Sequence, residues 1–190
     1  MKYLQSVTPE DKTTLHKVLK ERIESIEGKS NNDSSKKTEL KPKVKDMVKN
    51  LDAKIKDKML DDENCPPKIL DLLADDDEVS ELKIVEHPNT SLKTLEKIVG
   101  KTQVLGNKIK AILHPNMTVS TLYKYVNSDD PGAKLGVARN PKATSDMLSL
   151  LADNEYDSIR EAVAKHPNAN PMILDRLSHD KDVIAAKYAL

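Results

Sequence analysis

Aromatic residues are almost absent from this chain of 190 residues, which contains no tryptophan, no phenylalanine and five tyrosines. A hydrophobic core must therefore be built from Leu, Ile, Val, Ala and Met, as in helical repeat proteins. The shortage of aromatic side chains also disfavours single-stranded nucleic acid as a ligand, because its bases usually stack on aromatic rings. Basic and acidic residues balance at 31 each, so the chain has no net charge that would favour nucleic acid or a membrane surface.

Cysteine is limited to Cys65, which excludes an internal disulfide framework and fits a reducing compartment. No stretch approaches the roughly 20 apolar residues of a membrane-spanning helix. Met1–Pro9 contains no apolar run, so we expect no signal peptide. We predict a cytoplasmic protein without membrane association. Its 37% apolar content is enough for the core of one domain plus an appendage.

A repeat organises the second half of the chain. His-Pro-Asn occurs at 87–89, 114–116 and 166–168, and Asn-Pro-Lys stands in the same place at 140–142. The turn prolines are 27, 26 and 26 residues apart, at Pro88, Pro115, Pro141 and Pro167. Seven residues after each proline is a leucine that we expect in the core: Leu95, Leu122, Leu148 and Leu174. A fixed period in this range is typical of solenoid proteins.

The turns predict where helices end and begin. A residue before proline is disfavoured in helical conformation, so each His or Asn of the turns should close a helix. Ser91, Thr118 and Thr144 should cap the segments that follow, and Pro171 suits the first position of a helix. A unit of about 26 residues cannot bury its apolar face alone, so the units should stack into a continuous core.

The pattern from Leu148 through Asp153 to the run 159–167 resembles the leucine-rich repeat variant, a relative of HEAT-like α-solenoids. The resemblance covers about 64–190 and implies helices alternating with short helical segments in a right-handed superhelix. The founding member of that family carries an iron–sulfur cluster on clustered cysteines; with Cys65 alone, we expect no cofactor here. We therefore predict an all-α fold, with a right-handed α-solenoid of about five repeats of 26 residues at 64–190.

Two amphipathic helices are predicted before the repeats, at 1–28 and 42–63, joined by a flexible linker at 29–41 that is rich in Lys, Asn and Ser. The second helix is basic, because the sequence between Ser34 and Leu60 contains nine lysines and four acidic residues. It either caps the first repeat with its lysines in solvent, or docks on an acidic partner. The lysines selected for the second role are Lys45, Lys49 and Lys56.

Catalytic and metal-binding patterns are lacking. Gly100-Lys101-Thr102 has neither the earlier glycine nor the strand of a phosphate-binding loop. His87, His114 and His166 occupy equivalent places in repeats on the order of 10 Å apart. Zinc ligands lie about 2 Å from the metal, so these histidines cannot share one ion and should have structural roles. We predict that the protein is not an enzyme and binds no metal.

A periodic set of cations is the remaining candidate site. Lys108, Lys134 and Arg160 stand seven residues before the turn prolines, and Arg139 and Lys165 stand two residues before them. Stacked repeats would align these side chains as a basic stripe that grips phosphates or an acidic protein segment, unless they form an ordinary solvated face.

Three functions remain open. The first is a non-catalytic protein-interaction or scaffold module, tethered by its N-terminal helices, with a protein as its partner. The alternative is a nucleic-acid-binding protein that uses the basic stripe. A weaker alternative is a structural component of a large assembly such as a phage particle.

Overall fold

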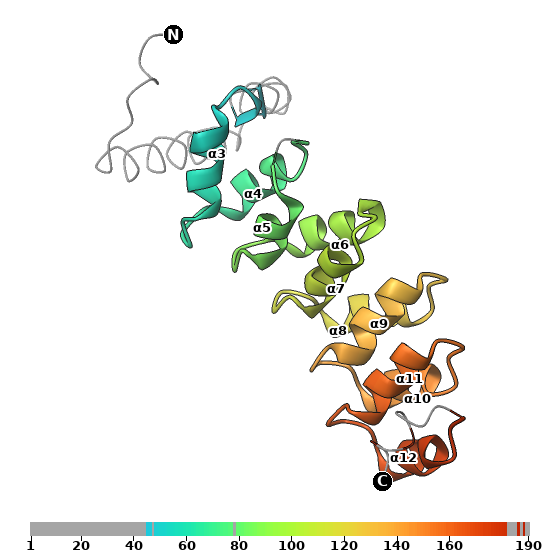
Figure 1. Cartoon of the computed structure of the whole chain (residues 1–190). Helices are drawn as coiled ribbons and strands as arrows, with labels where there is room; N and C mark the ends of the chain where they lie inside the picture. The colour runs from blue at the N-terminus through green and yellow to red at the C-terminus, as the bar shows by residue number, and fades with distance from the viewer. Residues whose placement is uncertain (1–44, 47, 78, 182–185, 187, 189–190) are drawn as a thin grey trace, which may run out of the picture. The chain divides into compact units, whose positions relative to one another are not determined.

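The computed structural model describes residues 45–46, 48–77, 79–181, 186 and 188 (Figure 1). Within these ranges the regular structure is entirely helical, which confirms the predicted all-α class. The predicted helix at 1–28 and linker at 29–41 lie outside the described residues. The helices named in Figure 1 are α3 (Ala53–Leu60), α4 (Pro67–Leu73), α5 (Glu81–Glu86), α6 (Leu92–Lys101), α7 (Leu105–Leu113), α8 (Val119–Val126), α9 (Pro131–Arg139), α10 (Ser145–Leu151), α11 (Asp157–Ala164) and α12 (Pro171–Ser178).

The chain divides into two compact units between Val79 and Ser80, whereas the sequence placed a boundary between 63 and 64. In the first unit, α3 starts after Asp52, whose extended backbone and side chain cap the helix by accepting a hydrogen bond from the Lys54 N–H at 2.8 Å. A turn at Asn50 and a bend at Leu51 come before it. The prediction of one continuous helix across 42–63 is therefore wrong, because Asp52 begins a new helix.

The second unit is built from helices that alternate between two rows (Figure 1). In one row α5 packs on α7, α7 on α9, and α9 on α11. The helices between them form the other row, in which α8 packs on α10. Each of α6, α8 and α10 also packs on the helix that follows it, so the core lies between the rows. This arrangement is the helical repeat-like architecture that the turn spacing predicts.

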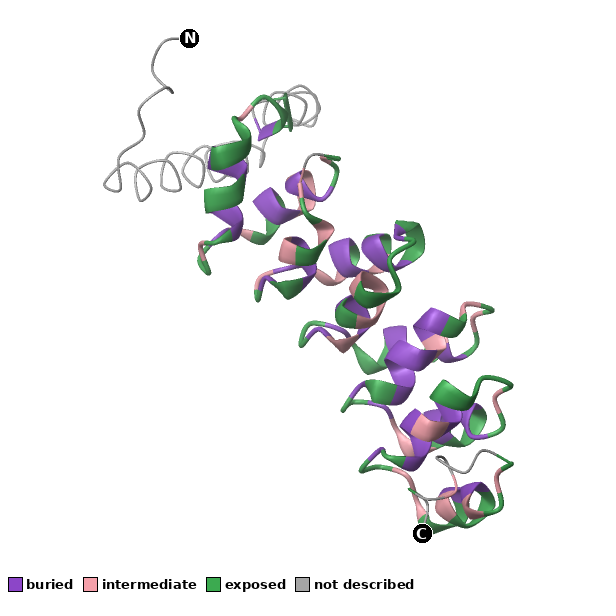
Figure 2. Cartoon of the chain, in the orientation of Figure 1, coloured by how far each residue is buried: buried purple, intermediate pink, exposed green. Residues whose placement is uncertain are grey.

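Small residues bring α7 and α9 close together. A Cβ atom added at Gly136 would lie 3.0 Å from Ile112 Cβ and 2.9 Å from Ile112 Cδ1. One added at Gly132 would lie 2.7 Å from Leu105 Cδ1. Six of the nine residues of α9 are buried. Figure 2 shows this helix largely in the colour of buried residues. The α7–α9 contact therefore leaves no room for side chains at these two positions.

The core leucines follow the predicted register with one exception. Leu95, Leu122 and Leu148 are fully buried, as expected. Leu174 is only half-buried, so its predicted place in the core is wrong, and Ile173 and Leu177 supply the buried side chains of α12 instead. Ile173 and Leu177 are equivalent to Met147 and Leu151 of α10, where Leu148 is buried as well, so the buried face of α12 is narrower than that of α10.

Helix caps fall where the sequence predicted them. The hydroxyl of Ser91 accepts a hydrogen bond from the Thr94 N–H, that of Thr118 from the Thr121 N–H, and that of Thr144 from the Met147 N–H. Each satisfies a backbone donor that the first helical turn leaves without a partner. Pro171 opens α12, as expected from its fixed φ angle. The caps set the start of the second helix in each repeat, and thereby its register in the core.

The His-Pro-Asn turns are joined to one another by a ladder of hydrogen bonds. In the turn at 114–116, His114 Nδ1 accepts the Asn116 N–H at 3.0 Å, so Nε2 carries the proton and donates to the His87 carbonyl at 3.0 Å. The Asn116 side-chain amide donates to the carbonyls of Pro88 and Thr90 in the preceding turn. The turn at 166–168 repeats this pattern: His166 Nε2 donates to the Asn140 carbonyl at 2.9 Å. The predicted structural role of these histidines is confirmed.

The variant turn at 140–142 is also joined to the preceding repeat, but Asn140 reaches a carbonyl of α7 and not one of the preceding turn. Asn140 Oδ1 accepts the Lys142 N–H at 2.8 Å in place of an imidazole nitrogen, and Nδ2 donates to the Ile112 carbonyl at 2.5 Å. The Lys142 ammonium donates to the carbonyls of Pro115 and Met117, where the other turns use an asparagine amide. An amide can therefore replace the imidazole in this ladder, since both groups offer one acceptor and one donor.

Replacing His114 by Ala should lower the free energy of unfolding by about 1–3 kcal/mol, because it leaves the Asn116 N–H and the His87 carbonyl without their partner in a buried turn. His114→Asn should cost less, since Asn140 shows that an amide fits the equivalent place. Urea unfolding of both variants measures the difference. Equal losses in the two would contradict a hydrogen-bonding role for the ring.

Stability should also depend on pH through His114. Burial lowers the pKa of this imidazole below 6.5; the hydrogen bond to the His87 carbonyl acts in the opposite direction but does not outweigh burial, to which the charge of Lys142 adds. The unfolded chain takes up a proton near pH 6.5 that the folded chain resists, so acid favours unfolding. The contribution of His114 is present above pH 6.5 and is lost as the pH falls below it. Thermal unfolding should show a smaller acid sensitivity in His114→Asn than in the wild type.

Candidate binding groove

The residues of the predicted basic stripe differ in exposure: Arg139 and Lys165 are exposed, whereas the others are partly or fully buried. Arg160 is 4% exposed, so its predicted position on a binding surface is wrong. Its Nε and Nη2 atoms donate to the two carboxylate oxygens of Asp180, at 2.7 and 3.0 Å, and Nη2 also contacts Asp157. Nη1 donates to the carbonyls of Asn154 and Glu155. Hydrogen bonding to Asp180 raises the pKa of this guanidinium, which is fully engaged inside the protein.

Lys108 is also engaged within the fold. Its ammonium pairs with the carboxylate of Asp130, which caps α9 by accepting the N–H groups of Gly132 and Ala133. Burial raises the pKa of this carboxyl, but the hydrogen bonds from Lys108 and the helix outweigh it, so the pKa is lowered overall. Lys108 therefore connects α7 to the start of α9.

In the first unit, Lys56 is 3% exposed and pairs with Asp76 at 2.7 Å, so its predicted surface role is wrong as well. Burial of a lysine alone would be unfavourable, and the carboxylate offsets that cost. Lys45 and Lys49 are exposed, and their predicted part in partner binding stays a prediction.

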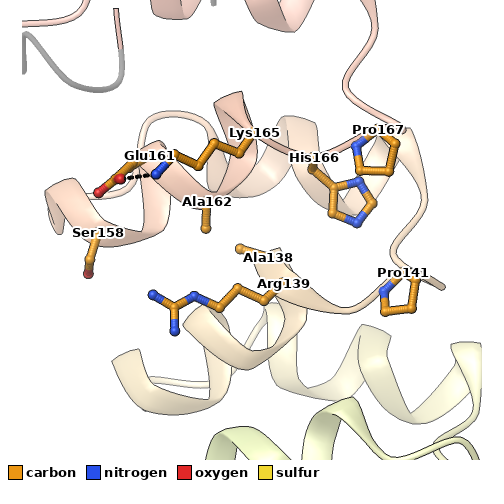
Figure 3. A pocket seen from close by; sticks show the side chains of 9 residues that line it. All are labelled: Ala138, Arg139, Pro141, Ser158, Glu161, Ala162, Lys165, His166 and Pro167. Carbon is orange, nitrogen blue, oxygen red and sulfur yellow. Dashed lines mark hydrogen bonds and ion pairs between the residues drawn. The ribbon is translucent and has the colours of Figure 1, made fainter. Parts of the chain in front are cut away.

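Two exposed members of the stripe, Arg139 and Lys165, line a groove between α9 and α11 (Figure 3). The groove has a volume of about 340 Å³. Ala138 and Ala162 face each other across it, and Arg139 extends toward the end where Ser158 lies (Figure 3). The turns at the other end contribute three further lining residues, Pro141, His166 and Pro167.

Of the three charged residues that line the groove, Glu161 and Lys165 are paired with each other. Glu161 forms an ion pair with Lys165 one helical turn later, and this hydrogen bond raises the pKa of the lysine. The Lys165 ammonium also lies 4.0 Å from the ring centre of Tyr188. Arg139 makes no hydrogen bond or ion pair with any residue in the part of the chain that the structure describes. The groove therefore presents an unmatched guanidinium beside an internally neutralised pair.

Comparison of equivalent positions explains why this groove exists. Between α5 and α7, Lys110 forms an ion pair with Glu86. Lys110 stands five residues before the turn proline of its own repeat, and Glu86 stands two residues before the turn proline of the preceding one. At the α9–α11 contact the same two places are held by Ala162 and Arg139. The Ala162 side chain is too short to reach α9, and Arg139 is basic where the equivalent Glu86 is acidic. A space that an ion pair spans earlier in the chain is open here.

Sequence reasoning selected Arg139 and Lys165 but missed Ala138, Ser158, Glu161 and Ala162. The available signal was the residue five positions before each turn proline, which runs Lys83, Lys110, Gly136 and Ala162. Lys134, the remaining member of the stripe, is half-buried, does not line the groove and makes no ion pair with a described residue.

The groove is suited to holding an anion rather than to proton transfer. Both ring nitrogens of His166 are occupied by backbone groups, so the ring is not available as a base for Ser158. Among the described residues, no three His, Cys, Asp or Glu side chains gather as a metal would need. None of the described helices has the length and apolarity to cross a bilayer.

No protein family, curated protein or solved structure matches this chain. The likeness to the leucine-rich repeat variant thus rests on the turn spacing and the residues quoted for it.

Proposed function

We propose that the protein is a non-catalytic protein-interaction or scaffold module. It is a right-handed α-solenoid of about five repeats, related to the leucine-rich repeat variant and HEAT-like families, which its N-terminal helices tether to a partner in the cytoplasm. The two rows of helices and the ladder between turns support the solenoid. The observation that carries the binding role is the α9–α11 groove, where Arg139 is left without an internal partner.

Nucleic acid is a weaker partner than the sequence alone indicated. A polyanion is held by several exposed cations whose counterions are released on binding. Arg160 is buried in ion pairs, Lys108 is held by Asp130, and Lys165 is paired with Glu161. Within the described residues, Lys134 and Arg139 are thus the members of the stripe without an ion pair, and two cations are too few for a continuous phosphate track along it.

The Cys65 thiol is fully buried, so it is protected from oxidants in any setting, the proposed cytoplasmic one included. Burial raises its pKa to about 12, so it remains protonated and unreactive at neutral pH.

The proposed function is tested by affinity capture with the full-length tagged protein from nuclease-treated extracts of its own cells. We expect a protein partner that the wild type retains and Arg139→Glu loses. Lys93→Glu is the matched control, because it changes the same charge at an exposed residue far along the chain from the groove. Loss of the partner on nuclease treatment would favour nucleic acid. A capture profile equal to that of an unrelated protein would contradict an interaction role.

A further inference from the structure

The α9–α11 groove has features that select one class of ligand. Its volume of about 340 Å³ is at the small end of the roughly 300–1,000 Å³ found for ligand sites. It accommodates a few side chains, not a duplex. Its floor is made of Ala138 and Ala162, both buried, and prolines from the two turns.

Arg139 has no carboxylate paired with it among the described residues that line the groove, because Glu161 is paired with Lys165. A guanidinium presents its N–H donors in a planar fork that matches two carboxylate oxygens. Elsewhere in this chain Arg160 makes that pairing with Asp180. Arg139 has the same group in a partly enclosed site without a described acid to receive it. The one described acid that lines the groove, Glu161, is paired with Lys165, so Arg139 stays available to an incoming carboxylate.

We infer that this groove binds an acidic peptide segment of a partner protein, with one Asp or Glu carboxylate on the Arg139 guanidinium and a small apolar residue against Ala138 and Ala162. The inference rests on the proposed function and specifies its partner. The neighbouring side chain should be small because the groove has a volume of only about 340 Å³, and apolar because Ala138 and Ala162 line it (Figure 3). An extended segment suits a groove that runs between two helices, since neighbouring side chains of such a segment point to opposite sides.

The chain itself supplies a variant that should close the groove. Arg139→Glu combined with Ala162→Lys places the Glu86–Lys110 ion pair at the equivalent positions of α9 and α11. The fold should tolerate this pair because it already contains one. Far-ultraviolet circular dichroism and urea unfolding establish that the double variant is folded.

The test is selection of random peptides displayed on phage against the full-length wild type, with removal of clones that bind the double variant. We expect the enriched peptides to contain Asp or Glu next to Ala, Gly, Ser or Pro. A synthetic peptide from this set should bind Arg139→Glu about tenfold to a hundredfold more weakly, as expected when a charge-assisted hydrogen bond is lost. Replacing its acid by the amide should have a similar effect on the wild type and little on Arg139→Glu. Lys93→Glu should bind as the wild type does.

Three outcomes would overturn the inference: no enriched peptide, enriched peptides without a carboxylate, or acidic peptides that bind Arg139→Glu as tightly as the wild type. If acidic peptides bind elsewhere, the groove is not their site but the interaction module stands. If nuclease-treated extracts yield no partner while the peptide behaves as expected, the groove is a peptide site and the cellular role is wrong.

Discussion

Replacing Arg160 by Met should lower the free energy of unfolding by about 2–3 kcal/mol, less than the roughly 3–5 kcal/mol lost when one partner of a fully buried ion pair is removed, because this network is part-buried. The guanidinium serves two carboxylates and two carbonyls from a position that is 4% exposed. Methionine keeps most of the packing volume but offers no donor. The Asp180 carboxylate, itself 8% exposed, would lose the group that neutralises it. Urea unfolding followed by circular dichroism measures the loss.

The same helix provides the control. Lys165→Met removes a surface ion pair with Glu161, one helical turn away, and should cost far less than Arg160→Met because solvent screens exposed charges. In a double-mutant cycle, Arg160→Met combined with Asp180→Asn should be less destabilising than the sum of the two single changes. Additive losses, or equal losses for Arg160→Met and Lys165→Met, would show that the buried network contributes little.

Truncating Leu122 to Ala should cost about 2–5 kcal/mol, because its side chain is fully buried and the cavity left behind closes only in part. Leu148→Ala should behave alike, since this leucine has the same place in α10. Leu174→Ala should lose less, because the equivalent residue of α12 is half-buried. Melting temperatures of the three variants give the order.

Leu150 is the matched control for these leucines. It lies in α10 and is 60% exposed, so Leu150→Ala should change stability by no more than about 0.5 kcal/mol. A loss at Leu150 as large as that at Leu122 would mean that the face of α10 taken as exposed is covered in solution.

The framework of the second unit was predictable because its signals are local. Proline ends helices through its own ring, and a hydroxyl caps the helix that starts beside it. The turn prolines and Ser91, Thr118 and Thr144 therefore indicate helix boundaries without any knowledge of the fold. The break before α3 was missed because the apolar stripe at 42–63 continues across Asp52, which by itself does not distinguish a cap from an exposed helical residue.

The candidate site was harder to predict because it depends on contacts between repeats. Periodicity correctly aligned Lys108 and Arg160, but it said nothing about the carboxylates that meet them, Asp130 and Asp180, about 20 residues further on. Asp130 lies directly before α9 and Asp180 two residues after α12, outside the turns and helices on which the periodic pattern rests. The groove itself arises from a small residue, Ala162, and a search for charged residues does not detect the absence of a side chain.

The ladder between turns also has a direction along the chain. Every side-chain donor in it belongs to the later turn, as at His114, Asn140 and His166, and every acceptor is a backbone carbonyl of the turn or helix before it. These carbonyl acceptors are in place as soon as the earlier turn and helix have folded, and they do not depend on the side chains of that segment. A ribosome releases the chain in the same order, at about 5–20 residues per second. Each new repeat can therefore lock onto the one already outside the exit tunnel, and synthesis from the N-terminus builds the stack without waiting for the residues that follow.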